Sequence, residues 1–331
     1  MISKSRRTLC SALGLSALWA AAGVAAAADK NLRVAILLSG FEPYYVSHNE
    51  AFIAGLRELG YVEGKNLTID RRYARLRGNQ MPALARELVG LRPDVIITAC
   101  TGSTRAVMRA TQQIPIVMVS VADPVGQGFV HNLAQPGNNV TGRSSQSRDL
   151  MPKMLELLHA AVPKATRIAV LVNTFNTAHE ALWSDMQAAA RPLGITPVRA
   201  EVNGPDGLDA MLDDLKQIAA GGLLVLADDP MTYNLRRQVI DAANQRKLPV
   251  LYGHREFVAD GGFMSYGESF QDSYRRVGTY VDKLARGANP AQLPIEQPTR
   301  FQLVINLKTA SLIGITPPKS LLLRADELIR G

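Results

Sequence analysis

Residues 121–145 read VADPVGQGFVHNLAQPGNNVTGRSS, and this stretch decides how the rest of the chain is interpreted. It follows IVMVSV at residues 116–121, an apolar and β-branched run that predicts a buried strand. Four glycines, two prolines and three asparagines exclude a single regular element over its length. A long loop after a buried strand is where an open α/β sheet places ligand contacts, although its composition alone fits an ordinary surface loop equally well.

The first 28 residues have the composition of a targeting segment. A basic stretch over residues 4–7 precedes an apolar, alanine-rich run over residues 8–24, and residues 25–28 offer small side chains for cleavage. The apolar run is short for a retained membrane anchor. Two adjacent arginines in the basic stretch partly match a twin-arginine signal, so this route and the general secretory route both stay open. We expect a cleaved signal peptide over residues 1–28 and a periplasmic protein.

Charge and cysteine content exclude several classes of protein. The net charge is +8 for 331 residues, and it falls to +5 without the targeting segment, which holds three basic residues and no acid. The remaining basic residues are scattered rather than gathered in one stripe, so we expect no nucleic-acid partner. Cys100 is the one cysteine left, and no Cys/His spacing is typical of a metal site. We therefore expect no disulfide, no metal and no cofactor.

Buried-strand patterns alternate with helical periodicity from residue 32 onward. In the first half, the order is strand, helix, strand, helix, strand, helix, strand, with ranges 32–38, 47–59, 67–73, 81–91, 94–99, 104–113 and 116–121. A second series of the same kind begins at residues 167–173 and includes strands over 195–202, 223–227 and 248–252. This alternation is typical of doubly wound parallel sheets. Two such lobes can hold a ligand between the facing carboxyl ends of their strands.

The last part of the chain predicts a return to the first lobe and back. A strand over residues 263–266, a helix over 272–286 and a strand over 302–307 are interpreted as recrossings, which gives three hinge strands. We expect lobe 1 to comprise residues 29–147 and about 265–295. We expect lobe 2 to comprise about 148–264 and 296–331.

Several segments resemble one known family. The sequences ADPVGQGFV at 122–130 and NLAQPGNNVTG at 132–142 are similar to DPVGxGxVxSLxxPGGNxTG, the pattern of an ABC-transporter substrate-binding family that includes tryptophan- and tyrosine-type proteins. Asn132 and Asn138 replace the usual Ser and Gly, and both are compatible with turns. Further similar segments are residues 50–66, GGFMSYGES at 261–269, and 274–329.

The resemblance covers nearly all of the chain from about residue 32 to 329. It implies an α/β protein of the periplasmic binding protein type I fold, with two doubly wound parallel-sheet lobes joined by a hinge. It further implies an exported, non-enzymatic solute-binding protein of an ABC importer. Such a protein would close its lobes on an amino acid or similar organic solute and deliver it to an ABC permease in the inner membrane. We expect a monomer.

Candidate ligand contacts lie where strands end and helices begin. The polar turn after residue 99 combines a strand end with a helix N-terminus, an arrangement that binds anions. We expect Thr98, Thr101 and Ser103 to hold a ligand carboxylate, with helix capping as the alternative role of Ser103. Asp228 follows a strand and is expected to pair with a ligand ammonium group, while capping of the next helix by Asp228 or Asp229 is the alternative.

The full set of expected ligand contacts takes residues from both lobes. For Asn173 the alternative is a helix cap, and for Tyr266 it is core packing. The set is Ser39, Thr98, Thr101, Ser103, Asp123, Ser145, Asn173, Asp228, Tyr252 and Tyr266.

Three other classes of function are compatible with such a cleft. An exported enzyme is disfavoured because the chain has no HExxH, GxSxG or phosphate-loop motif and no nucleophile–base constellation. The ligand domain of a transcription regulator shares the lobe architecture, but the targeting segment and the lack of an N-terminal helix-turn-helix argue against it. A sensor subunit that reports its ligand to a membrane receptor remains an open alternative.

Overall fold

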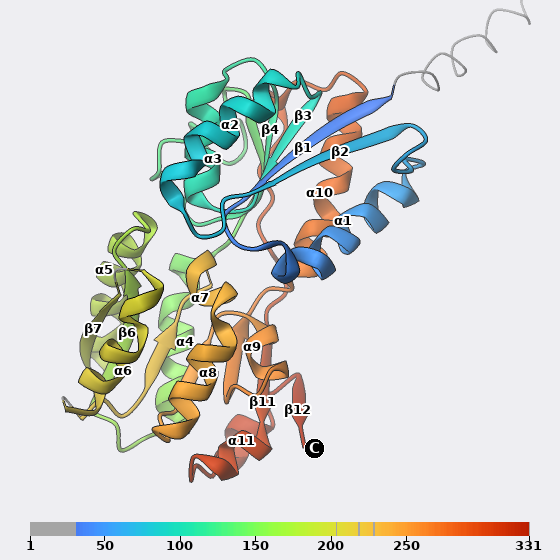
Figure 1. Ribbon diagram of the computed structural model, residues 1–331. Helices are drawn as coiled ribbons and strands as arrows, with labels where there is room; N and C mark the ends of the chain where they lie inside the picture. Colours follow the sequence, from blue (N-terminus) through green and yellow to red (C-terminus); the bar gives the residue numbers. More distant parts are fainter. Residues whose placement is uncertain (1–30, 203, 218, 228, 331) are drawn as a thin grey trace, which may run out of the picture.

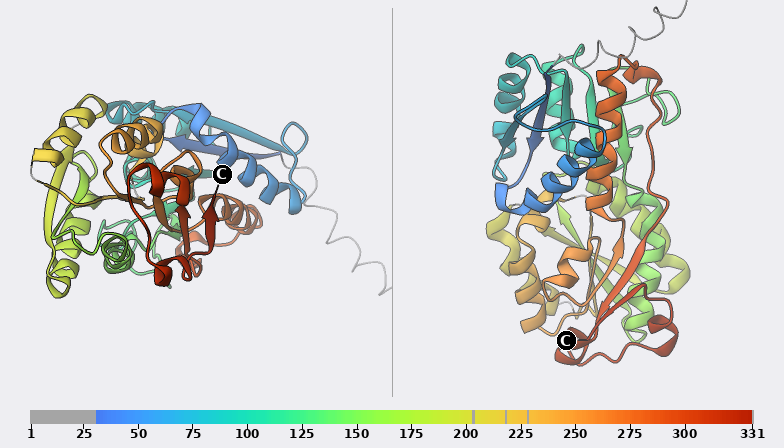
Figure 2. Two further views of the ribbon diagram at one scale, coloured as in Figure 1. Left: turned by 90° about the horizontal axis from the view of Figure 1, so that it is seen from below. Right: turned by 90° about the vertical axis from the view of Figure 1, so that its right-hand side faces the viewer.

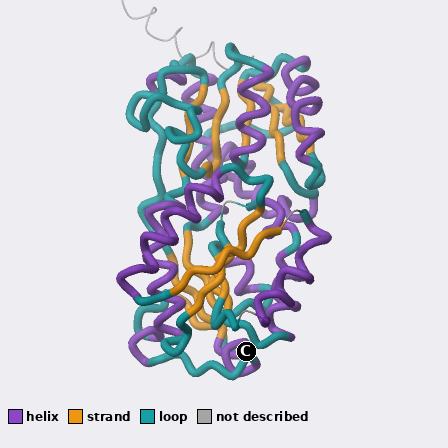
Figure 3. Tube along the Cα trace, turned by 90° about the vertical axis from the view of Figure 1, so that its left-hand side faces the viewer, coloured by secondary structure: helices purple, strands orange, loops and turns teal. Residues whose placement is uncertain are grey.

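The computed structural model describes residues 31–202, 204–217, 219–227 and 229–330 (Figure 1). These residues form two α/β lobes that stack end to end, each with strands flanked by helices (Figure 3). Lobe 1 is the upper lobe in Figure 1 and lobe 2 the lower one.

Lobe 1 contains a five-stranded parallel sheet in the order β2-β1-β3-β4-β5. β1, β3 and β4 are buried apolar runs of the kind that the sequence predicted, whereas β2 (LTIDRRY) carries charged residues and β5 (VTGRS) was not predicted as a strand. The strands are β1 Leu32–Leu38, β2 Leu67–Tyr73, β3 Val95–Thr98, β4 Ile116–Val121 and β5 Val140–Ser144. The helical elements are η1 Glu42–Tyr45, α1 Val46–Glu58, η2 Gly78–Gln80, α2 Met81–Gly90 and α3 Thr101–Ala110.

Lobe 2 contains a seven-stranded sheet in the order β12-β11-β10-β9-β8-β6-β7, parallel except where β10 meets β11. Its strands are β6 Arg167–Asn173, β7 Thr196–Val202, β8 Leu223–Val225, β9 Val250–Tyr252, β10 Met264–Gly267, β11 Gln302–Asn306 and β12 Glu327–Ile329. Its helical elements are α4 Ser147–Ala161, α5 Ala178–Ala190, η3 Arg191–Leu193, η4 Pro205–Gly207, α6 Leu208–Gln217, α7 Pro230–Asn234, α8 Arg236–Gln245, α9 Arg255–Ala259, α11 Leu307–Leu312 and α12 Lys319–Leu322.

Helix α10, Phe270–Ala285, returns to lobe 1 and packs beside α1, as two views agree (Figures 1 and 2). It is followed by η5, Pro290–Gln292. The two helices approach closely because each has a glycine at the contact: a Cβ on Gly55 would lie 2.3 Å from the carbonyl oxygen of Arg275, and one on Gly278 would lie 3.1 Å from the Gly55 carbonyl carbon. Tyr274 and Tyr280 on α10 are buried in the same core as β1 and α1.

The chain crosses between the lobes three times, between β5 and α4, between β10 and α10, and between η5 and β11. The second crossing differs from the boundary expected at residue 265, because β10 still pairs with β9 and β11 in the lobe 2 sheet. Gly267 makes this possible, since a Cβ there would lie 2.0 Å from the carbonyl oxygen of Gly253. The change to lobe 1 therefore follows Gly267.

The first and third crossings pair with each other through their backbones. The amide of Ser144 donates to the carbonyl of Glu296, and the amide of Glu296 donates to the carbonyl of Gly142, both at 3.0 Å. The first and third crossing segments thus run side by side between the lobes and are joined by backbone hydrogen bonds.

Buried charges join the second crossing to the other two. The Glu268 carboxylate accepts hydrogen bonds from Ser120 Oγ at 2.9 Å and Ser273 Oγ at 2.6 Å. Arg143 lies 3.7 Å from Glu268 and 3.3 Å from the carboxylate of Glu296. The three crossings therefore meet in one charge network, in which Arg143 and Glu268 are largely shielded from water.

Candidate functional site

A cavity of about 1020 Å³ lies between the lobes, at the carboxyl ends of their strands. Ser39 after β1 and Thr101 at the start of α3 line it from lobe 1. Asn173 at the end of β6 and Asp229 after β8 line it from lobe 2. The structure thus brings three of the expected contacts, Ser39, Thr101 and Asn173, into one interlobe cleft.

Helix α3 starts inside this cleft, three residues earlier than the sequence predicted. Cys100 is the N-cap residue: its sulfur accepts from the amide of Ser103 at 3.5 Å, and Ser103 Oγ accepts from the amide of Cys100 at 3.2 Å. Thr101 and Gly102 therefore form the first helical turn, where amides have no acceptor within the helix. Gly102 adds no side chain, which leaves this positive helix end open to an anionic group.

Two of the expected carboxylate contacts serve the helix start instead. Ser103 is fully buried and completes the capping box as the partner of the N-cap residue Cys100, which is close to the capping role that was its alternative. The Thr98 hydroxyl is also fully buried and lies 2.8 Å from Thr104 Oγ1, which in turn donates to the Cys100 carbonyl at 2.9 Å. Neither residue lines the cleft. The small hydroxyls fill the space under α3, where each finds a partner within the protein.

The base of the cleft joins β1 to α3. Ser39 Oγ and Cys100 Sγ are 3.0 Å apart, and both residues line the cavity. Burial raises the pKa of the neighbouring Tyr45 hydroxyl, so this side of the base stays uncharged.

The lobe 2 wall is organised by one buried carboxylate. Asp229 is 2% exposed and caps α7, accepting from the amides of Met231 at 3.3 Å and Thr232 at 3.4 Å. Its Oδ1 also accepts from Asn173 Nδ2 at 2.9 Å, while Asn173 Oδ1 accepts from the amide of Phe175 at 3.1 Å. Asp229 is thus the acid that caps the helix. Asp228, the expected ammonium partner, lies outside the described residues.

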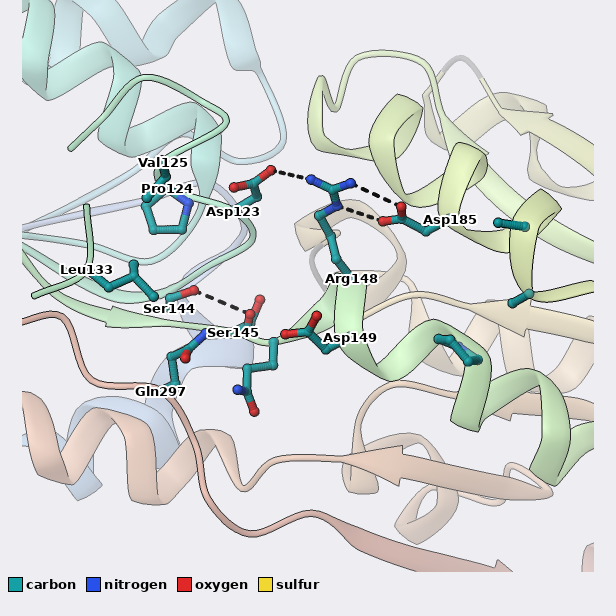
Figure 4. Close-up of a pocket in the computed structure, with 14 residues that line it drawn as sticks. Asp123, Pro124, Val125, Leu133, Ser144, Ser145, Arg148, Asp149, Asp185 and Gln297 are labelled. Carbon is teal, nitrogen blue, oxygen red and sulfur yellow. Dashed lines mark hydrogen bonds and ion pairs between the residues drawn. The ribbon is translucent and has the colours of Figure 1, made fainter. Parts of the chain in front are cut away.

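Asp123 and Ser145 line a different cavity, of about 670 Å³, beside the first crossing (Figure 4). Arg148 on α4 donates to Asp123 at 2.8 Å and to Asp185 at 2.6 Å, so it links the lobes. These two carboxylates raise the pKa of the Arg148 guanidinium. Ser145 Oγ lies 2.8 Å from Ser147 Oγ. The two expected contacts therefore belong to the hinge side of the lobe junction.

The two expected tyrosines lie in lobe 2, away from both cavities. Tyr252 is 1% exposed and stacks on Phe257 with 4.5 Å between ring centroids. Burial raises the pKa of its hydroxyl. Tyr266 is half-buried, with its ring 6.0 Å from that of Phe301. Tyr252 ends a strand that points toward the cleft, but its ring turns back under α9.

Uncharged contacts hold the lobes together beside the cleft. Gln127 Oε1 accepts from Thr177 Oγ1 of lobe 2 at 3.2 Å. The amide of Phe41 donates to Asn234 Oδ1 at 2.9 Å. Behind these, fully buried His48 on α1 places Nε2 3.2 Å from the Tyr233 hydroxyl on α7.

Comparison with known proteins identifies this architecture. The sequence pattern of a family described as "ABC transporter substrate binding protein" matches residues 34–329. The chain belongs to this family. Its two lobes have mostly parallel sheets, and together they have the type I periplasmic binding protein fold that the resemblance implied.

Three relatives of this ABC substrate-binding chain match about nine-tenths of it. A protein of Clostridioides difficile named "Tyrosine-binding protein" is 25% identical over 305 residues, which is 90% of this chain and 86% of that protein. A solved structure of a conserved domain protein from Vibrio cholerae is 30% identical, with a TM-score of 0.85 over 90% of this chain and all of that one. A Streptococcus pneumoniae ABC domain in complex with L-Trp is 23% identical, with a TM-score of 0.84 over 91% of this chain and all of that one.

Family membership confirms the prediction that this ABC substrate-binding protein is not an enzyme. Over residues 31–330, apart from the three undescribed positions, no group of His, Cys, Asp and Glu side chains has the geometry of a metal site. No helix in that same part of the chain is long and apolar enough to cross a membrane.

Four arginines that were not among the predicted contacts line the lobe 1 side of the cleft, Arg77, Arg86, Arg105 and Arg109. A pattern in the sequence could have found two of them. Positions 101, 105 and 109 are spaced four residues apart on α3, so they share the helix face that begins at the cleft.

Proposed function

We propose that this chain is the exported substrate-binding subunit of an ABC importer and that it closes its lobes on an amino acid or similar organic solute. One observation carries the proposal: the open N-terminus of α3 faces a cleft of about 1020 Å³ between the lobes. Its first-turn amides and helix dipole suit a carboxylate, and the lobe 2 wall supplies amide and carboxylate oxygens for a second polar group. Residues 1–28 would act as a cleaved signal, and a permease in the inner membrane would receive the solute.

Within the cleft we assign the ligand contacts to Ser39, Thr101 and Asn173, and to Asp228 by its position in the sequence. The basic targeting segment and the family support export, and the relatives named for tyrosine and crystallised with L-Trp make aromatic amino acids the first ligands to try. Because the three cleft residues come from both lobes, a bound solute would stabilise the closed arrangement.

The test is a thermal-shift and calorimetric screen of purified protein, freed of retained ligand, against amino acids and small carboxylates. A ligand that binds only the folded state stabilises it by about 2.7 kcal/mol at a hundredfold excess over its dissociation constant. We expect a clear rise in Tm with at least one amino acid. A flat screen on folded protein would contradict the proposed ligand class.

Two neighbouring substitutions separate binding from capping. We expect Asp228→Ala to weaken ligand binding at least tenfold without lowering Tm. Asp229→Ala should instead lower Tm, because that carboxylate holds α7 and Asn173. Unchanged ligand affinity in the Asp228 variant would refute its assignment as the ammonium partner.

A further inference from the structure

The lobe 1 wall of the cleft is cationic beyond the helix N-terminus. Arg77 lies in the loop before η2, Arg86 on α2, and Arg105 and Arg109 on α3, and all four line the cavity. Three of them are exposed and Arg105 is half-buried. The wall therefore carries four positive charges along the cavity.

Little in the described part of the chain neutralises this wall. Among the described residues, the one acid that lines the cavity is Asp229. It lies on the opposite wall, in lobe 2, where its carboxylate is already hydrogen-bonded to Asn173 and to the amide of Met231. Arg105 donates to Gln127, a neutral partner. No described carboxylate lies within ion-pair distance of the other three guanidinium groups. Glu87, next to Arg86 in sequence, pairs instead with Arg72 at 2.7 Å.

Closure of the cleft over such a wall has an electrostatic cost. Guanidinium groups that lose water without gaining a carboxylate destabilise the closed state, because burial of an unpaired charge is unfavourable. An anionic group on the ligand removes this cost and forms bidentate hydrogen bonds with arginine. The wall is thus suited to an anion that arrives with the ligand.

The spacing along α3 separates this anion from the one at the helix N-terminus. With a rise of about 1.5 Å per residue, Arg105 lies roughly 6 Å and Arg109 roughly 12 Å along the helix from Thr101. Apolar side chains, including Ala106 and Met81, line the cavity between the charged groups. A ligand that reaches both positions needs an apolar middle.

We propose that the cleft recognises a ligand with two acidic groups, an organic acid or amino acid whose first carboxylate binds at the α3 N-terminus and whose second acidic group binds the arginine wall. Ligands and probes with two acidic groups are called dianionic and those with one acidic group monoanionic, without counting the ammonium group of an amino acid. The second group is a carboxylate or a phosphate, since both match the guanidinium fork. This inference rests on the proposed function, because it names the class of solute for the same cleft.

The experiment compares matched probes that differ by one acidic group. The pairs are L-phenylalanine with 4-carboxy-L-phenylalanine, L-tyrosine with O-phospho-L-tyrosine, and octanoate with suberate. We expect at least one dianionic probe to bind the purified protein tenfold or more tightly than its partner, in calorimetric titrations. The gain should shrink at high ionic strength, because the wall is largely exposed. The first two pairs tell a second carboxylate from a phosphate.

Two variants assign the gain to the wall. The double substitution Arg86→Gln with Arg109→Gln should remove most of the tenfold gain while changing the affinity of the monoanionic partner less than twofold. The control is Arg57→Gln, which removes one positive charge from an exposed position on α1 outside the cleft. It should leave both affinities unchanged. Equal Tm values would show that all variants fold.

The outcomes separate this inference from the proposed function. If monoanionic amino acids bind and no dianionic probe gains more than twofold, the proposed function stands and the inference is overturned. The inference would also be overturned if the double variant weakened the binding of both members of a pair equally. The arginines would then not distinguish a ligand that has the second acidic group from one that lacks it. Failure of every probe to bind would contradict the proposed function and the inference together.

Discussion

Arginines lie at both sides of the lobe junction, but their electrostatic surroundings are opposite. On the hinge side, Arg143 has carboxylates of Glu268 and Glu296 within 3.7 Å and 3.3 Å, and Arg148 is held between two aspartates. On the cleft side, Arg86 and Arg109 have no carboxylate partner among the described residues. Carboxylates of the described chain balance the hinge arginines but not these two cleft arginines, whose charge would be balanced by the ligand in the dianionic reading that we propose.

The largest effect should follow loss of the hinge carboxylate at position 268. Glu268→Ala would leave the guanidinium of Arg143, whose side chain is only 11% exposed, without its buried partner and would strip Ser120 and Ser273 of their acceptor. We expect the free energy of unfolding to fall by about 3–5 kcal/mol. Urea denaturation measures this. A loss below about 1 kcal/mol would mean that the network does not hold the hinge.

The next effect is a dependence of stability on pH that comes from the uncharged contact between the lobes. The pKa of His48 is lowered to about 4, chiefly by burial and also by the charge of His254, while the charge of Glu256 opposes this shift. In the unfolded chain the pKa is about 6.5, so unfolded molecules take up the proton first as pH falls. The free energy of unfolding should therefore decrease from about pH 6.5 down to about pH 4, by up to about 3 kcal/mol, and stay level just above that window.

Urea titrations of wild type and His48→Gln at several pH values test this dependence. The variant lacks the titrating ring, so its stability should change much less across the same window. A variant that keeps the full slope would assign the pH dependence to other groups. The same variant breaks the uncharged His48–Tyr233 contact. Its stability therefore also shows whether uncharged contacts help to hold the lobe junction outside the hinge network.

A smaller effect is expected at the capping acid of the lobe 2 wall. Asp229→Ala removes an acceptor from two amides and from Asn173 Nδ2, and should lower the free energy of unfolding by about 1–3 kcal/mol. Asp229→Asn keeps one acceptor oxygen and should lose less. Thermal and urea unfolding of the pair would measure the difference. Equal losses in both variants would point to the charge rather than the hydrogen bonds.

The smallest effect on stability should come from the cleft arginines. Arg109→Gln removes a side chain that is exposed and forms no ion pair with a described carboxylate, so the free energy of unfolding should change by less than about 0.5 kcal/mol. The same measurement on Glu268→Ala gives the contrast directly. If Arg109→Gln lowered the free energy of unfolding as much as Glu268→Ala does, the cleft arginines would matter as much for stability as the hinge network, which would contradict the comparison.

The sequence predicted the fold well because buried parallel strands are continuous apolar runs that periodicity detects. The ranges of β1, β2 and β4 match the predicted ones, and the second and third crossings follow from the strands and the helix predicted after residue 260. The start of α3 was placed late because Thr-Gly-Ser is typical of a turn. These residues are tolerated in a first helical turn, where a cysteine took the capping role.

The candidate site was predicted less completely, for reasons of side-chain direction. Ser39, Thr101 and Asn173 follow strand ends and do line the cleft, whereas Tyr252 ends a strand with its ring turned into the core. The sequence offers no sign of that rotamer. The arginine wall depends on how α2 and α3 lie side by side, and neighbouring helices are not visible in a local pattern.

The return of α10 to lobe 1 has a consequence for how the protein is made. Lobe 1 is discontinuous: its core around Leu56 is completed by Tyr274 and Tyr280, which are synthesised only after most of lobe 2. A growing chain therefore cannot bury that core until more than four-fifths of it has left the ribosome. If the chain is exported as proposed and crosses the membrane unfolded, the late completion of this core would help to keep it unfolded until it has crossed. If the proposed export takes the general secretory route, which stays open beside the twin-arginine route, export and folding would be successive steps set by the order of the elements.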